Sequence, residues 1–218
     1  NQAPHKMTEL LKHEFAIQNK IYNMIKYFLI FFIFCGGSIT IVNSHETIAS
    51  FGIVFSVVAI PLALIGVSAN FLRPDIEDGS LELLLASFKP SQIILAKYLS
   101  LFVCGFIGFI INVPFSYLLF NIAIDQLLLI ITCGLLLMAS SAAIIMLISS
   151  IQSYFRSNTN FLSVLIMPLI IPSIILSGII IQSDNNYSLA LILLGVNCII
   201  VPASIYLSSY LIENIYNI

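Results

Sequence analysis

The sequence predicts an all-α membrane protein with six transmembrane helices. Of its 218 residues, 60% are hydrophobic and only 8% are charged, and the mean hydropathy is +1.08. Average soluble domains carry about 25% charged residues, so a soluble core is excluded. Six apolar runs are long enough to cross a bilayer core, which takes about 20 residues of α-helix. In lipid, a spanning helix satisfies its own backbone hydrogen bonds, and runs of this length are typical of helices.

The six apolar runs are separated by connections of which the alternate ones, after the first, third and fifth runs, are very short. The first run is weakest at its far end, where Gly36 and Gly37 interrupt it. The longer runs exceed the thickness of the hydrocarbon core, so they must tilt or extend beyond it. The expected spans are Tyr27–Val42, Ile48–Leu72, Ile93–Asn121, Gln126–Ile151, Phe161–Ile181 and Leu189–Leu211.

Residues 1–26 are expected to precede a transmembrane domain that covers residues 27–218. We expect residues 1–6 to be a tag remnant and Met7 to be the native start. The segment from Met7 to Lys26 places apolar residues among charged ones with helical spacing. This pattern predicts a helix that lies on the inner membrane surface. The apolar residues are Leu10, Leu11, Phe15, Ile17, Ile21 and Ile25.

All eight Lys and Arg residues fall on one side of this topology. They lie in the N-terminal arm, in the second connection, at the start of the third span and in the fourth connection, whereas the alternate connections carry none. Basic residues concentrate on the cytoplasmic side of membrane proteins. An even number of spans places both termini on one side, so both termini are predicted to be cytoplasmic.

The second connection, residues 73–90, carries six of the charged residues. Asp75 is expected to cap a helix that starts near Ile76, and Pro90 is expected to end it. Asp78 and Glu82 are four residues apart and would share one face of this helix. A different face would hold Leu81, Leu84, Leu85 and Phe88.

Two interpretations of this connection remain open. It is either an interfacial helix that only turns the chain or a docking element for a protein partner. Interfacial helices normally present Lys and Arg to anionic headgroups, whereas this one presents acids. Acidic residues suit a basic protein partner better, which favours docking. The four acids are Asp75, Glu77, Asp78 and Glu82.

The sequence carries no motif for a reaction of its own. A GxxxxGKS/T phosphate-binding loop is missing from it, so the chain is not expected to hydrolyse ATP. His5, His13 and His45 are isolated in sequence and Trp is absent, so we expect neither a metal site nor a bound haem. The four cysteines fall within apolar runs and form no CxxC pair, which favours a packing role.

The predicted spans hold neutral polar residues and prolines instead of charges at mid-depth. Proton- and ion-coupled carriers place ionisable groups there, so the sequence argues against that class of transporter. Asn112 and Asn197 are expected to form hydrogen bonds between helices. Pro114, Pro168 and Pro172 are expected to kink their helices, because proline removes a backbone donor.

Three groups of residues together resemble a known family of membrane proteins. The first is Asp75 followed by Asp78, Gly79, Ser80, Leu81 and Glu82, directly after a span that ends in Phe71; the second is Leu95, Ala96 and Lys97; the third is Pro168, Leu169, Ile171 and Pro172. In these positions they resemble the CcmB family of permease subunits from the ABC-type haem exporter of cytochrome c maturation. The resemblance extends from about Leu10 over nearly the whole chain.

The resemblance implies an ABC-2-type permease architecture in the bacterial cytoplasmic (inner) membrane, with the mitochondrial inner membrane as the alternative. It implies that the chain binds no cofactor, that haem is a possible cargo and that ATP binds to a partner. The implied partners are a CcmA-like cytoplasmic ATPase, a second copy of the chain, CcmC-like and CcmD-like haem-handling membrane subunits, a CcmE-like periplasmic haem chaperone and membrane lipid. No nucleic-acid partner is implied.

By the same resemblance, residues 73–90 form the coupling segment that sits in a groove of the ATPase. The residues that would carry the coupling are Asp75, Glu77, Asp78, Gly79, Leu81, Glu82 and Leu84. Two other functions stay open: an ABC-2 permease that exports a lipid, a polysaccharide or a drug, and a structural membrane scaffold. The scaffold differs in having no ATPase partner.

The predicted orientation is testable by cysteine labelling in sealed cells. In a background without native cysteines, Ser44→Cys, Gln126→Cys and Ser183→Cys should react with a membrane-impermeant maleimide. Ser87→Cys and Ser157→Cys should react only after the cells are opened, because the basic residues hold that side in the cytoplasm. Labelling of Ser87→Cys in sealed cells would reverse the orientation.

Overall fold

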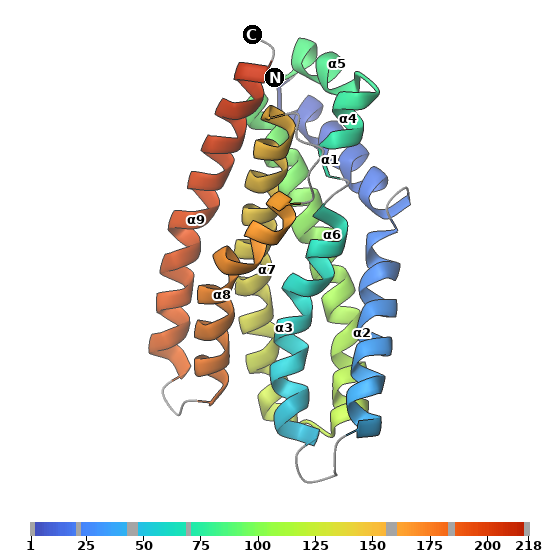
Figure 1. Ribbon diagram of the computed structural model, residues 1–218, viewed down its shortest axis with the longest axis vertical. Helices are drawn as coiled ribbons and strands as arrows, with labels where there is room; N and C mark the ends of the chain where they lie inside the picture. The colour runs from blue at the N-terminus through green and yellow to red at the C-terminus, as the bar shows by residue number, and fades with distance from the viewer. Residues whose placement is uncertain are drawn as a thin grey trace.

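A computed structural model describes residues 3–20, 23–42, 48–68, 71–155, 161–182 and 186–215. These residues form nine helices and no strand (Figure 1). The helices are α1 (Ala3–Lys20), α2 (Met24–Val42), α3 (Ile48–Ser68), α4 (Arg73–Glu77), α5 (Ser80–Ser87), α6 (Pro90–Phe120), α7 (Ile124–Tyr154), α8 (Phe161–Gln182) and α9 (Asn186–Ile215). The predicted all-α fold is confirmed.

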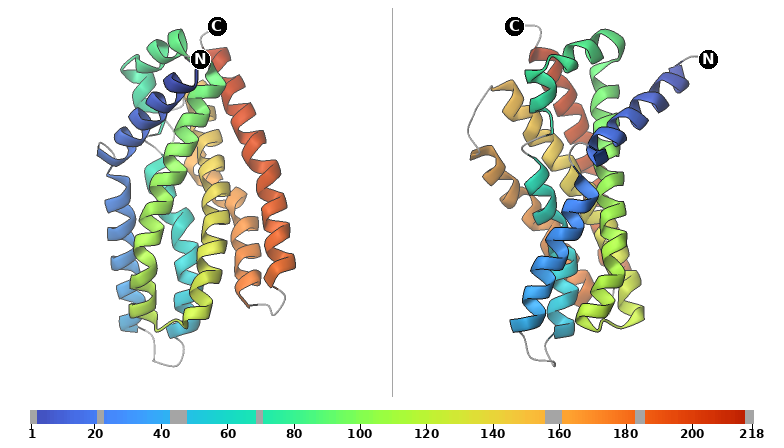
Figure 2. Two further views of the ribbon diagram at one scale, coloured as in Figure 1. Left: turned by 180° about the vertical axis from the view of Figure 1, so that it is seen from behind. Right: turned by 90° about the vertical axis from the view of Figure 1, so that its right-hand side faces the viewer.

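The helices form an elongated bundle with one distinctive end. The helices α2, α3, α6, α7, α8 and α9 run along the bundle, whereas α1, α4 and α5 gather at one end (Figure 1). Both termini lie at this same end, which we call the terminal end of the bundle (Figure 2). The helix α2 runs away from the terminal end and α3 returns to it, and the pairs α6–α7 and α8–α9 repeat this path.

Four helices are long and apolar enough to cross a membrane, which makes this a multi-pass membrane protein. Among the described residues these spans are Met24–Ile41, Pro90–Phe120, Gln126–Tyr154 and Ser188–Ile215. The predicted second and fifth spans correspond to shorter apolar stretches, Phe51–Gly66 and Pro168–Ile181. Four of the six predicted spans therefore meet the length and composition expected of a crossing helix, and the other two stay a prediction.

The core of the bundle lies around α6 and α7. Most of each of these two spans is buried inside the chain, whereas α2 and α9 are mostly exposed. The exposed side chains of α9 are largely apolar, as lipid contact requires, and include Leu191, Ile199 and Tyr206. The helix α6, one of the two most buried spans, begins at the terminal end of the bundle.

The polar and proline residues predicted within the spans occupy two kinds of environment. The Asn112 side-chain amide donates hydrogen bonds to the Gly108 carbonyl oxygen on its own helix at 3.0 Å and to that of Phe28 on α2 at 3.3 Å, so it links two helices. The Asn197 amide donates to Leu193 within α9 at 2.9 Å. Pro114 lies inside α6, and Pro168 and Pro172 lie inside α8, at exposed positions.

Close packing between α3 and α6 leads to a prediction about Gly52. A Cβ atom at this position would overlap the Cβ atom and ring of Phe120, which is fully buried. Gly52→Ala should therefore lower the thermal unfolding midpoint of the chain in detergent, because overpacking a close contact costs about 1–3 kcal/mol. Gly178→Ala is the matched control, since a Cβ atom there meets no described atom within 4 Å. Equal midpoints for the two variants would contradict the packing.

Candidate functional site

The charged connection forms two short helices, α4 and α5, instead of the single predicted helix. The expectation of one helix from about Ile76 that carries both Asp78 and Glu82 is wrong. The chain turns at Gly79, whose φ of 77° lies in the left-handed region that glycine adopts without strain. Asp78 and Glu82 consequently belong to different elements, and Asp78 lies in the turn between them.

The residues of the turn explain why the helix breaks here. Pro74 lies in the first turn of α4, where a missing N–H is tolerated. The backbone N–H of Asp78 donates to the Pro74 carbonyl oxygen at 2.9 Å and closes α4. The Asp78 carboxylate then accepts the backbone N–H of Ser80 at 2.9 Å at the start of α5. This hydrogen bond from Ser80 lowers the pKa of Asp78, which keeps the exposed carboxylate ionised.

The helices α4 and α5 with the turn between them, residues 73–87, form a unit that we call the docking hairpin, and its exposed side, which we call the docking face, is acidic and includes one leucine. Glu77, Asp78 and Glu82 are exposed, and Leu83 is 73% exposed. Arg73 pairs with Glu77 at 2.6 Å, so part of the negative charge at the start of α4 is neutralised. Exposed carboxylates together with an exposed leucine suit a partner that offers both basic groups and an apolar pocket.

Leu81 and Leu84, which were predicted to contact the partner, do not lie on the docking face. Leu81 is fully buried inside the chain, and Leu84 is half-buried against the core. They hold α5 onto the bundle, and the side chain that faces outward is Leu83. The predicted apolar face of the segment exists, but it is turned toward the bundle and not toward a partner.

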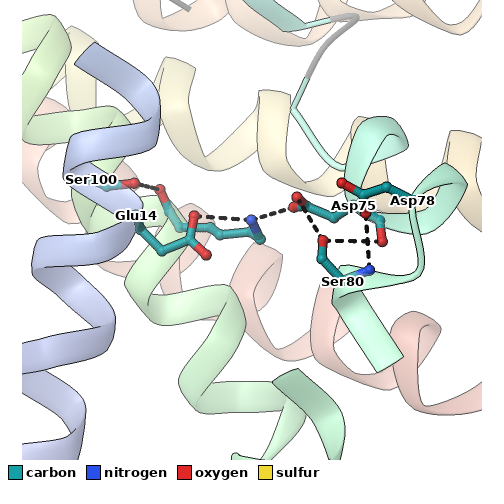
Figure 3. Close-up of polar contacts among 6 residues, drawn as sticks. Glu14, Asp75, Asp78, Ser80 and Ser100 are labelled. Carbon is teal, nitrogen blue, oxygen red and sulfur yellow. Dashed lines mark hydrogen bonds and ion pairs between the residues drawn. The ribbon is translucent and has the colours of Figure 1, made fainter. Parts of the chain in front are cut away.

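Asp75 faces inward as well, into an ion triad with Lys97 and Glu14. The Lys97 Nζ atom lies 2.5 Å from Asp75 Oδ2 and 3.0 Å from Glu14 Oε2. Side-chain exposure is 2% for Lys97, 1% for Glu14 and 14% for Asp75. Figure 3 shows Glu14 and Asp75 directed toward one another from α1 and α4. The triad therefore joins α1, α4 and α6 at the terminal end.

Further hydrogen bonds fix the triad in place. The Ser80 hydroxyl lies 3.3 Å from Asp75 Oδ1, across the turn of the hairpin, and the Ser100 hydroxyl donates to the Lys97 carbonyl oxygen at 2.8 Å (Figure 3). A buried ammonium group is costly without a partner, and the removal of one member of such a pair costs about 3–5 kcal/mol. The triad is accordingly a strong constraint on how the three helices meet.

The sequence reasoning did not find Glu14 or Lys97 as functional residues, although two signals were present. Lys97 is a lone cation in a long apolar run, and such a residue needs an acidic partner. Glu14 follows Leu10 by four residues and precedes Gln18 by four, so the three share one helix face. This face of α1 is buried, which shows that α1 packs on α6 as well as extending along the surface.

The helix α1 also differs in extent from the prediction. It begins at Ala3, so it includes part of the segment expected to be a tag remnant. Figure 2 shows α1 crossing the bundle obliquely beside α6. The buried Glu14–Lys97 ion pair ties α1 to α6.

The described residues offer no alternative chemistry at this end. Within the part of the chain that the structure describes, no group of three or more His, Cys, Asp and Glu residues is arranged to hold a metal ion. His13 is exposed on α1, and His45 lies outside the described residues.

Comparison with known proteins identifies the family of the chain. The sequence model of the family described as CcmB protein matches residues 5–211. The chain belongs to the CcmB family. CcmB proteins are transporter permease subunits in haem transport for cytochrome c biogenesis, so the predicted family is confirmed and the chain is not an enzyme.

The relatives agree over almost the whole chain. An uncharacterized protein of Rickettsia conorii and another of Rickettsia prowazekii are each 43% identical over 209 residues. Each alignment covers 96% of this chain and 97% of the relative. No solved structure matches the chain significantly. The CcmB assignment therefore covers the docking hairpin, the triad and all the predicted spans.

The turn between α4 and α5 leads to a prediction about Gly79. Gly79→Val should loosen the hairpin, because a β-branched residue in the left-handed region costs about 1–2 kcal/mol. Limited proteolysis of the purified chain should then cut residues 73–90 faster than in the unsubstituted chain. Gly79→Asn is the matched control, since asparagine tolerates this backbone conformation and should leave the cleavage rate nearly unchanged. Equal rates for the two variants would show that the turn does not depend on the glycine.

Proposed function

We propose that this CcmB protein is the membrane permease subunit of an ABC transporter in haem export or in release of the haem-loaded chaperone for c-type cytochrome biogenesis. A separate subunit supplies ATP hydrolysis. The observation that carries the proposal is the acidic docking face on α4 and α5, which stands at the terminal end of a bundle that belongs to the CcmB family. The cargo is then haem itself or the haem-loaded chaperone, and the chain is proposed to hold no cofactor.

The membrane arrangement in this proposal has six spans and both termini in the cytoplasm. The shared end of the two termini supports an even number of crossings. The basic residues of α1 and of the connection at residues 73–90 belong to that same end, in agreement with the positive-inside rule. The bacterial origin of the relatives supports the cytoplasmic membrane of a bacterium.

The docking face is proposed to sit in a basic groove of the CcmA-like ATPase. Glu77, Asp78 and Glu82 would steer the approach, and Leu83 would fill an apolar pocket in the groove. Such a division is typical of interfaces, in which charges set orientation and one desolvated apolar side chain supplies much of the affinity. The coupling role of Asp75, Gly79, Leu81 and Leu84 is then internal: they shape the hairpin and hold it to the bundle.

Further partners follow from the family. A second copy of the chain, CcmC-like and CcmD-like membrane subunits and a CcmE-like periplasmic chaperone would complete the assembly, within membrane lipid. The exposed apolar sides of α2 and α9 leave room for protein neighbours in the membrane as well as for lipid.

Charge reversal on the docking face tests the proposed function. Asp78→Lys combined with Glu82→Lys should lower the ATPase recovered with the purified chain by tenfold or more, since the loss of a desolvated charge pair costs about 2–5 kcal/mol. Matured c-type cytochrome, measured by haem staining, should fall with it. The amount of chain in the membrane should stay unchanged, because both side chains are exposed.

Two sets of controls separate the docking face from charge and folding effects. Glu9→Lys with Glu213→Lys makes the same change of net charge at exposed positions on α1 and α9 and should leave ATPase recovery intact. Leu83→Ala should reduce ATPase recovery, whereas Leu81→Ala should reduce the amount of folded chain, because Leu81 is fully buried. Full ATPase recovery and normal cytochrome levels after the double reversal would refute the coupling role.

A further inference from the structure

We infer that Lys97 is a positioning residue with two unequal partners: Glu14 holds α1 to α6 permanently, and Asp75 holds α4 to α6 by a contact that opens when the ATPase moves the docking face. The inference rests on the proposed function and deepens it, because it names the contact through which movement passes from the docking hairpin into a span. Three observations on the triad carry it.

The first observation is that the two acids are packed differently. Glu14 lies on a helix that packs along α6, and the neighbouring Leu10 and Gln18 are buried with it. In the described part of the chain, by contrast, the backbone of α4 packs against α5 and α7 and does not reach α6. The long Lys97 side chain bridges that gap. Separation of α1 from α6 would thus expose several buried groups, whereas α4 meets α6 through the Asp75–Lys97 ion pair.

The second observation is that Asp75 is partly exposed and has a second polar partner, whereas Glu14 has neither among the described residues. The Asp75 side chain is 14% exposed, and the Ser80 hydroxyl of the same hairpin lies within 3.3 Å of its other carboxylate oxygen. If the hairpin moves as a unit, this contact moves with it, and water reaches the carboxylate. Glu14 is 1% exposed, and Lys97 is its only hydrogen-bond partner among the residues that the structure describes. Of the two carboxylates, Glu14 therefore has the larger desolvation penalty.

The third observation is the count of charges. The triad has one ammonium group and two carboxylates, so its formal charge is negative while both acids are in contact. Withdrawal of Asp75 leaves a neutral Lys97–Glu14 pair. Lys97 therefore never becomes an unpaired buried cation during the movement, which would be the expensive state. The second acid therefore allows one contact to open and close while Lys97 stays paired.

The inference predicts unequal effects on stability, which are measured on the purified chain in detergent. Glu14→Gln should lower the thermal unfolding midpoint clearly more than Asp75→Asn does, and both variants remove one carboxylate without changing shape. This comparison needs no ATPase and no cytochrome, so it decides between equal and unequal partners even if the proposed function fails. Equal losses, or a larger loss for Asp75→Asn, would overturn the inference.

Inversion of the charges tests the transmission of movement in cells that contain the complete system. Glu14→Lys combined with Lys97→Glu keeps an ion pair between α1 and α6 but places a carboxylate of α6 opposite Asp75. We expect chain abundance and ATPase recovery within about twofold of the unsubstituted chain, and matured cytochrome c per chain about tenfold lower, which corresponds to about 1.4 kcal/mol of lost coupling. Adding Asp75→Lys inverts the whole triad and should restore maturation.

The readouts separate failure of this inference from failure of the proposed function. Asp75→Lys alone is the matched control, since it carries the third substitution without the other two and should not mature cytochrome normally. Normal maturation in the double variant, or no recovery in the triple variant, would overturn the role of Asp75 as the contact that transmits movement. Absence of any ATPase with the unsubstituted chain would instead refute the proposed function and leave the stability comparison to decide the triad.

Discussion

A single buried cation determines how the terminal end of this protein is built. The side chain of Lys97 is enclosed at the start of a membrane-spanning helix, where an ammonium group is tolerated only beside an opposite charge. Two acids from helices far apart in the sequence supply that charge, and their helices are thereby fixed against α6. The orientation of the amphipathic helix α1 and of the docking hairpin both follow from this requirement.

The docking hairpin uses different residues for attachment to the bundle and for the exposed docking face. Asp75 and Leu81 face the bundle and hold the hairpin in place, whereas Asp78, Glu82 and Leu83 face outward. The turn at Gly79 makes this separation possible, because it directs the acids of the two short helices independently of one helical period. In a single continuous helix, Asp75 and Glu82 would share one face because they are seven residues apart. Asp75 could then not face the bundle while Glu82 faces outward.

The fold was readable from the sequence because membrane spans are local, repetitive signals. Apolar runs of helical length located the six helices that run along the bundle, and three groups of residues together indicated the family. The details of the site were not readable in the same way. The helix period placed Asp78 and Glu82 on one element because it did not weigh the turn chemistry of Gly79, and it could not show which side of α5 faces the bundle. The pairing of Glu14 with Lys97 joins residues 83 positions apart, so no local pattern contains it.

The same separation along the chain orders the events of biosynthesis. Glu14 leaves the ribosome 83 residues before Lys97, and at about 5–20 residues per second this interval lasts roughly 4 to 17 seconds. During that time α1 has no buried cation to pair with, so its carboxylate must stay in water and the helix must wait at the membrane surface. The acid on its buried face thus favours a place for α1 at the membrane surface until α6 arrives to receive it.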